Sequence, residues 1–144
     1  MLERGARSTP NGERRTTVPR VLLIDDTPEI AELLTYALRD RGYDVVSSGF
    51  DTAIGELARE HEADAIVLDC SVYEMSESLF DSLRSDPERQ ALPVVIVSDT
   101  PEKADASLQA RNAEHVLLIP KPFTGAQVAR ALDELLSSSS SASP

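Results

Sequence analysis

The stretch "VLLIDDTPEIAELL", residues 21–34, joins an apolar run to two adjacent aspartates, Asp25 and Asp26, and then to a new pattern. The run before the aspartates has the length of a buried strand. After it, apolar residues recur with the spacing of one helical face: Ile30, Leu33, Leu34, Ala37 and Leu38. Thr27 is expected to cap this helix, Pro28 fits its first position, and Gly42 stands where it should stop. The stretch therefore predicts a strand, a tight turn carrying two carboxylates, and an amphipathic helix.

The same alternation continues along the chain. The expected strands cover residues 20–25, 43–48, 64–70, 92–99 and 115–122, and the expected helices cover 27–42, 51–62, 77–86, 101–113 and 124–136. Strands that are apolar on both faces belong to a sheet covered on both sides, which favours parallel pairing. The pattern predicts an α/β fold with a doubly wound five-stranded parallel sheet. In such a sheet the functional site lies beyond the carboxyl ends of the strands.

Composition limits the protein class. The chain has 144 residues, 41% of them hydrophobic, which suits one globular domain. No apolar run approaches the roughly 20 residues needed to cross a bilayer, so no membrane span is expected. The net charge of -11 argues against a nucleic-acid backbone as the main partner. A single cysteine, Cys70, excludes an intramolecular disulfide and makes a cytoplasmic location the expectation.

Three segments are expected. Residues 1–19 contain glycine, proline and arginine with little apolar periodicity, and they predict a flexible basic arm. Residues 20–136 form the folded domain. Residues 137–144 are rich in serine and are expected to be a disordered tail.

The ends of the expected strands carry reactive side chains. Asp25 and Asp26 follow the first strand, and Asp69, Ser98 and Lys121 follow the third, fourth and fifth. Each alone could be a cap or a turn residue, but together they lie at one edge of the sheet. Closely packed carboxylates repel unless a cation neutralises them, and a hard ion such as Mg²⁺ prefers oxygen ligands.

These residue types suit phosphoryl transfer. Asp69, at the end of a rigid strand, can attack a phosphoryl donor and form an acyl phosphate. Lys121 and the metal would offset the charge of the phosphoryl oxygens, and the Ser98 hydroxyl could donate a hydrogen bond to one of them.

In order and spacing, "VLLIDD", "IVLD", "IVSD" and "PKPF" resemble the motifs of a two-component response-regulator receiver domain, from about residue 20 to residue 136. The resemblance implies a flavodoxin-like (βα)5 fold and phosphoryl transfer to Asp69 from a sensor histidine kinase or a phosphotransfer protein. It implies that Mg²⁺ is held by Asp26, Asp69 and the backbone carbonyl of Ser71, with Asp25 acting largely through water. It also implies a cis peptide bond before Pro122. The domain would then be no enzyme beyond its own aspartyl phosphorylation and dephosphorylation.

The sequence departs from that family at several positions. Tyr73 and Glu77 stand where the family carries a proline and a glycine, so a different turn is expected after Asp69. Asp99 replaces a small residue beside Ser98 and could obstruct a phosphodonor. Leu118 or Val116 stands where the fifth strand carries an aromatic switch residue. Ser71 and Thr100 occupy positions that influence dephosphorylation in the family.

Three functions are compatible with this pattern. The first is a receiver without a DNA-binding domain, which signals by binding an unknown output protein through its fourth helix, fifth strand and fifth helix. The second is a pseudo-receiver that docks partners without being phosphorylated. A phosphohydrolase is the least favoured, because the short loops offer no lid. Cys70 is expected to be a buried apolar residue, and His61 and His115 are too scattered to form a metal site.

Overall fold

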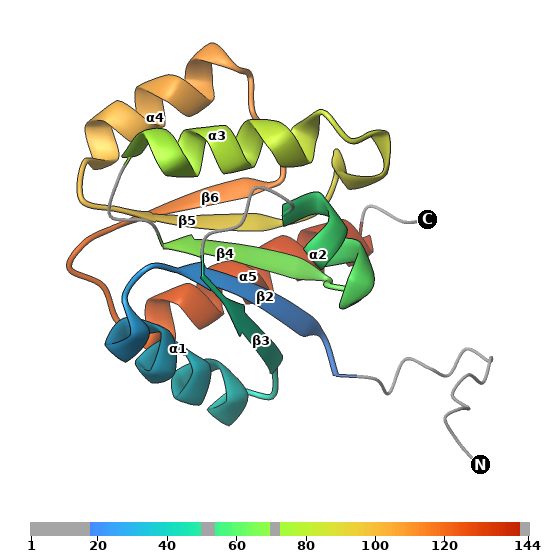
Figure 1. The fold of residues 1–144 in the computed structure, drawn as a ribbon, viewed down its shortest axis with the longest axis vertical. Coiled ribbons are helices and arrows are strands. Elements are labelled where there is room, and N and C mark those ends of the chain that lie inside the picture. The colour runs from blue at the N-terminus through green and yellow to red at the C-terminus, as the bar shows by residue number, and fades with distance from the viewer. Residues whose placement is uncertain (1–17, 50–53, 70–72, 142–144) are drawn as a thin grey trace.

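The predicted strands assemble into one parallel sheet in the computed structural model, which describes residues 18–49, 54–69 and 73–141 (Figure 1). The strands are β2 (Arg20–Asp25), β3 (Asp44–Ser48), β4 (Ala65–Asp69), β5 (Val94–Ser98) and β6 (Val116–Pro120). The helices are α1 (Pro28–Asp40), α2 (Ile54–Glu60), α3 (Tyr73–Arg84), α4 (Pro101–Ala110) and α5 (Gly125–Ser141), with a short 3-10 turn, η2 (Pro87–Arg89). The sheet order is β3-β2-β4-β5-β6, and every neighbouring pair is parallel. The predicted doubly wound fold is confirmed.

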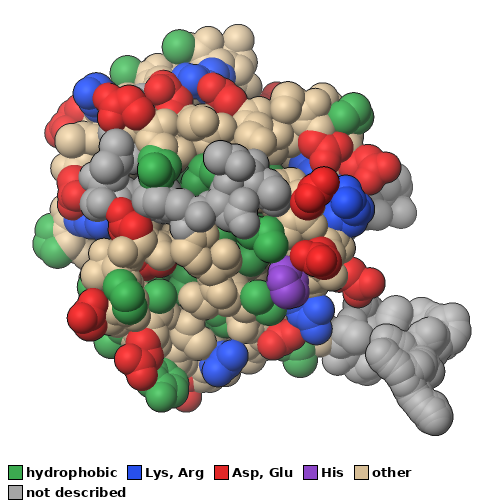
Figure 2. All heavy atoms as spheres, viewed as in Figure 1, with side chains coloured by type: hydrophobic (Ala, Val, Ile, Leu, Met, Phe, Trp, Pro, Cys, Tyr) green, Lys and Arg blue, Asp and Glu red, His purple; other side chains and the backbone are tan. Residues whose placement is uncertain are grey.

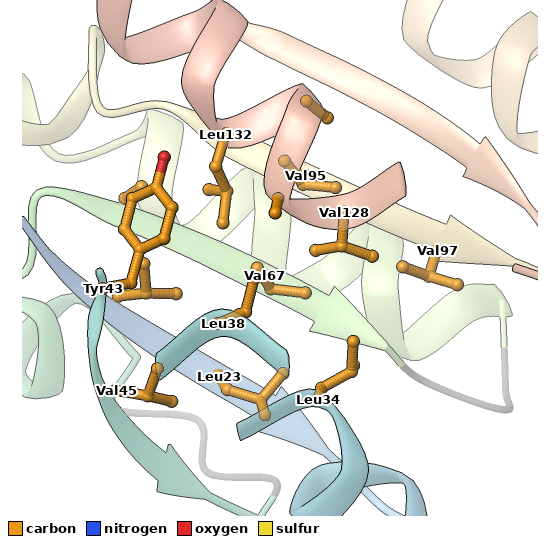
Figure 3. Packing of buried hydrophobic residues seen from close by; sticks show 14 of the residues in the cluster. Leu23, Leu34, Leu38, Tyr43, Val45, Val67, Val95, Val97, Val128 and Leu132 are labelled. Atoms are coloured by element: carbon orange, nitrogen blue, oxygen red, sulfur yellow. The ribbon is translucent and has the colours of Figure 1, made fainter. Parts of the chain in front are cut away.

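Alternate residues of the central strands point to opposite layers of helices. One face of the sheet packs against α1 and α5, and we call it the α1/α5 face. Its core includes Leu23, Val67, Val95, Val97 and Leu132 (Figure 3). The other packs against α2, α3 and α4, the α2–α4 face; its core includes Leu22, Ile24, Ile66, Leu68, Phe80 and Leu83. Because both faces are covered, the strand ends are where polar side chains can gather.

The turn after β2 begins α1 differently from the prediction. Thr27 is the N-cap residue, but its side chain caps no backbone N–H. Instead the Thr27 N–H donates to Asp25 Oδ1 at 2.8 Å. At the other end, Gly42 has a φ of +94°, a conformation that glycine adopts without a Cβ penalty, and the predicted end of the helix is confirmed.

Three helix boundaries were predicted wrongly. Helix α4 ends at Ala110, not at residue 113. Helix α3 begins at Tyr73, not at residue 77, so Glu77 lies inside a regular helix and needs no positive φ. Helix α5 continues to Ser141, beyond the predicted end at residue 136 and into the serine run taken for a disordered tail. Serine has only a modestly unfavourable helix propensity, and no glycine or proline interrupts the chain before Pro144. The predicted arm, up to residue 17, and the predicted cap Asp51 lie outside the described residues.

Helix α4 is polar, as expected, and Ala104 is its buried residue. Acidic side chains are scattered over the face shown in Figure 2, in keeping with the net charge of -11. In the part of the chain that the structure describes, no helix combines the length and apolar character required to span a membrane.

Candidate functional site

The parallel register brings the predicted side chains to one edge. Asp25 and Asp69 are register partners in the neighbouring strands β2 and β4. Ser98 ends β5 opposite Pro120 of β6, and Lys121 follows directly. The Lys121 N–H donates to the Ser98 carbonyl at 2.9 Å, which anchors the lysine to the end of β5.

Asp69 lies at the centre of this edge. Its side chain is only 2% exposed, and its Oδ1 is 3.0 Å from the Lys121 Nζ. Its Oδ2 is buried and has no hydrogen-bond partner. A buried carboxylate with one oxygen held by a cation and the other unsatisfied is costly to maintain unless a ligand or a reaction uses that oxygen.

Asp25 and Asp26 have different environments. Asp25 is buried, its Oδ1 accepts the Thr27 N–H, and its Oδ2 has no hydrogen-bond partner. Asp26 is exposed at the rim, where the Thr27 hydroxyl donates to its Oδ1 at 3.3 Å. Burial raises the pKa of Asp25 to about 7 against the lowering effect of the Thr27 N–H, and the neighbouring carboxylates of Asp69 and Asp26 raise it further.

The Lys121 ammonium is stabilised by the carboxylates at this edge of the sheet, which we call the acidic edge. Partial burial by itself lowers its pKa, but the hydrogen bond and charge of Asp69, with the charges of Asp99 and Asp25, outweigh burial and raise the pKa. Lys121 therefore stays protonated at neutral pH and supplies a fixed positive charge beside Asp69. The Lys121–Pro122 peptide bond is cis, as the resemblance implied.

Ser98 and the two residues after it form the opposite wall. The Ser98 Oγ accepts the Thr100 N–H at 3.0 Å and lies 3.4 Å from the Thr100 hydroxyl. Asp99, by contrast, is 58% exposed and approaches Lys121 at 3.9 Å. It lies at the rim and competes with Asp69 for the same ammonium.

The donor set fits a magnesium ion. Mg²⁺ prefers oxygen ligands and usually takes one or two protein carboxylates while keeping several waters. The unsatisfied Oδ2 atoms of Asp25 and Asp69 are such donors, and Asp26 is exposed nearby. Across residues 18–49, 54–69 and 73–141, no three acidic, histidine or cysteine side chains form a ready-made metal cage, so these carboxylates provide a partial ligand set. Ser71, whose carbonyl was predicted as a ligand, and Cys70 lie outside the described residues.

A polar network that the sequence did not indicate joins α3 to α4. Arg111 donates to both carboxylate oxygens of Asp81, at 2.7 and 2.9 Å, and lies 3.3 Å from Glu77. The Ser107 hydroxyl donates to Glu77 at 2.7 Å and also accepts from Arg111. We call these four residues the α3–α4 clamp. Glu77 and Asp81 lie in α3, and Ser107 lies in α4 with Arg111 as its C-cap. Each pair has i, i+4 spacing, which indicates a shared face but not that the two faces meet.

Leu118, predicted at the switch position of the fifth strand, is half-buried against the core of the α2–α4 face. Tyr73, at the family's proline position, begins α3.

The family described as response regulator receiver domain matches residues 21–133 of this chain, and the chain belongs to it. This confirms the predicted resemblance. Phosphorylation-dependent signalling in two-component systems is the typical function of this family.

Curated relatives extend beyond this domain. The chain is 34% identical over 119 residues to the probable transcriptional regulatory protein TcrX of Mycobacterium tuberculosis, covering 81% of this chain and 49% of TcrX. It is 37% identical over 109 residues to protein-glutamate methylesterase/protein-glutamine glutaminase 2 of Pseudomonas syringae, covering 73% of this chain and 30% of that protein. The chain thus spans about half the length of TcrX and less of the methylesterase.

Among solved structures, the receiver domain of the sensor histidine kinase PA1611 from Pseudomonas aeruginosa is similar in fold. The TM-score is 0.69 at 21% identity, covering 84% of this chain and 99% of that one. That structure has a magnesium ion coordinated in its active-site cleft.

Proposed function

We propose that the domain accepts a phosphoryl group from a phosphohistidine on Asp69, with Mg²⁺ at the acidic edge, and signals by binding a partner. The observation that carries the proposal is the Asp69 carboxylate. It is almost fully buried, one oxygen is held by Lys121, and the other has no hydrogen-bond partner. That geometry leaves one oxygen available to a ligand or an electrophile at the end of a rigid strand.

The transfer step follows from the surrounding charges. A carboxylate oxygen of Asp69 attacks phosphorus, an acyl phosphate bond forms, the phosphorus–nitrogen bond of the donor breaks, and its electron pair stays on the imidazole. Lys121 neutralises charge on the phosphoryl oxygens. The Ser98 Oγ accepts the Thr100 N–H and lies 3.4 Å from the Thr100 hydroxyl, and rotation of its O–H bond would direct the proton toward the phosphoryl group. Asp26, Asp69 and the Ser71 carbonyl would hold Mg²⁺, with Asp25 acting largely through water, and the ion would supply positive charge that offsets the incoming phosphoryl oxygens.

Phosphorylation changes the charge at this edge, and this supports the signalling step. A phosphoryl dianion competes with Asp69 and Asp99 for Lys121 and attracts Ser98, which biases the turn leading into α4. The output surface would be α4, β6 and α5, and its partner a protein rather than DNA. The single cysteine, which excludes an intramolecular disulfide, supports a cytoplasmic location.

Incubation with acetyl phosphate and MgCl2, followed by intact-mass measurement, tests the proposal. The wild type should gain one phosphoryl group, and chelation of Mg²⁺ should prevent the gain. Asp69→Asn should gain none, whereas Asp40→Asn, the same change at an exposed aspartate of α1, should behave as the wild type. An unmodified wild type would instead support a pseudo-receiver. Asp99→Ala decides the role of the rim anion: faster phosphorylation means that Asp99 obstructs the donor.

A further inference from the structure

A cavity of about 80 Å³ lies between α3 and α4 on the α2–α4 face. Its apolar lining comes from Phe80 of α3, Ile96 of β5, and Ala104 and Leu108 of α4. It reaches Ser98 at the end of β5. The cavity therefore shares the wall formed by Ser98, Asp99 and Thr100 with the candidate site, but Asp25, Asp69 and Lys121 do not line it.

The charged side chains at this cavity are mainly acidic. Glu77, Asp99 and Arg111 line it. The Arg111 guanidinium is paired with Glu77 and also with Asp81, whose two oxygens it binds. Two carboxylates thus share this one guanidinium. Asp99 adds a third anion, and the Lys121 ammonium 3.9 Å from it is shared with Asp69, so carboxylates still outnumber cations here. An anionic ligand would meet net negative charge, whereas an ammonium group would be attracted.

We propose that this cavity binds a small amine with an aromatic or branched apolar body. The apolar body would lie among Phe80, Ile96, Ala104 and Leu108, and the ammonium group would face the carboxylates of Glu77 and Asp99. A ligand pocket with an apolar lining and a few orienting polar groups is the usual design of small-molecule sites.

The size of the cavity limits the ligand. An engineered cavity of about 150 Å³ in another protein holds a benzene molecule. This cavity is about half as large, so it encloses part of a ring or a short branched chain. The rest of the ligand extends to the mouth, where the α3–α4 clamp and Asp99 lie.

The proposal does not depend on phosphorylation of Asp69. Binding is measured on the unphosphorylated protein, so failure of the proposed function leaves this test unaffected, and the reverse also holds. Ser98 and Thr100 line the cavity as well, so a bound amine would contact the residues that begin α4.

The test compares three probes of similar shape: benzylamine, benzyl alcohol and benzoate. Each is titrated into the full chain while the backbone amide resonances are followed by NMR. Benzylamine should bind with a millimolar or tighter dissociation constant, benzoate at least tenfold more weakly, and the shifted amides should include Ala104 and Leu108. Binding of none of the three, or shifts confined to other surfaces, would overturn the proposal. Equal binding of all three would overturn the assignment of an amine.

Variants assign the binding to the cavity. Ala104→Leu fills the space and should weaken benzylamine binding at least tenfold; Ala104→Val is the milder change if the leucine variant does not fold. Ala110→Leu makes the same substitution on an exposed part of α4 and should leave the affinity unchanged. Glu77→Gln keeps an acceptor for Ser107 and should weaken benzylamine severalfold but not benzyl alcohol. Undiminished benzylamine binding by folded Ala104→Val and Ala104→Leu variants would place the site elsewhere.

Discussion

The two faces of the sheet are held together by different means. On the α1/α5 face, Leu34 and Leu38 of α1 and Val128 and Leu132 of α5 are fully excluded from solvent. The Tyr43 hydroxyl also donates to Asp133 of α5. On the α2–α4 face, α4 buries Ala104, and the polar α3–α4 clamp and a cavity occupy the space between α3 and α4.

This difference in packing suggests different roles for the helices on the two faces. Close-packed apolar side chains resist displacement, because each shift forfeits many contacts at once. Helix α4 is held largely by charged and hydrogen-bonded groups near its carboxyl end, while its amino end follows directly from Ser98 and Thr100. We therefore expect α1 and α5 to support the acidic edge and α4 to respond to changes at it.

Truncating a leucine on each face tests the comparison most strongly. Leu132→Ala leaves a cavity in a fully buried part of the α1/α5 face and should lower the free energy of unfolding by about 2–5 kcal/mol. Leu108→Ala removes a half-buried side chain beside an existing cavity, so its cost should be about 1 kcal/mol. Urea denaturation monitored by circular dichroism measures both, and equal losses would contradict the contrast between the faces.

Close approach of α5 to α1 provides a second test. A Cβ at Gly125 would overlap the Cβ of Ala37, so the helix start can lie this close only because residue 125 is glycine. Gly125→Ala should destabilise the protein by about 1–3 kcal/mol through overpacking. Ala37→Gly should restore part of the loss when combined with it. Additive losses in the double variant would show that the two positions do not clash.

Asp25, at the end of β2 between the two faces, should make the stability of the protein depend on pH. In metal-free protein the folded-state pKa of Asp25, about 7, is above its ordinary value of 3.8. The folded state then binds more protons than the unfolded state between these values, and the contribution of Asp25 to stability falls as pH rises through this window. Asp25→Asn should therefore be more stable than the wild type at pH 7.5 without Mg²⁺, by about 1–2 kcal/mol. The two should converge near pH 4.

Thermal or urea unfolding at both pH values, with and without Mg²⁺, measures this effect. Mg²⁺ should stabilise the wild type more at pH 7.5 than at pH 5, because protonation of Asp25 competes with the metal. A wild type that gains more stability than Asp25→Asn as pH rises would refute the assignment.

The smallest effect is expected at the α3–α4 clamp. Its side chains are partly exposed, and such pairs contribute less than about 1 kcal/mol, so Arg111→Gln should cost no more than that at pH 7. The hydrogen bond and charge of Arg111 lower the pKa of Asp81. The clamp's contribution is thus present above the ordinary carboxyl pKa and is lost as pH falls through the lowered one. The difference in free energy of unfolding between Arg111→Gln and the wild type, measured by urea denaturation, should therefore shrink at pH 3. If this difference does not change with pH, the clamp is not the cause of it.

Most of the fold could be predicted because strand and helix patterns are local. The apolar runs at Val21–Ile24 and in β4 and β5 are buried on both faces, and the helical spacing of α1 marks its inward side. The helix ends were less predictable. Serine in α5 weakly disfavours a helix without breaking it, and Tyr73 carries no strong signal for the start of α3.

The sequence by itself determined which side chains gather at the acidic edge, because parallel strands place their carboxyl ends together. Asp25, Asp26, Asp69, Ser98 and Lys121 could be named for that reason alone. Only the tertiary structure decided their individual environments. Register and burial leave Asp25 and Asp69 each with an unsatisfied oxygen but place Asp26 at the rim. The α3–α4 clamp and the cavity beside it likewise depend on how two helices distant in sequence pack, a relation that no local pattern encodes.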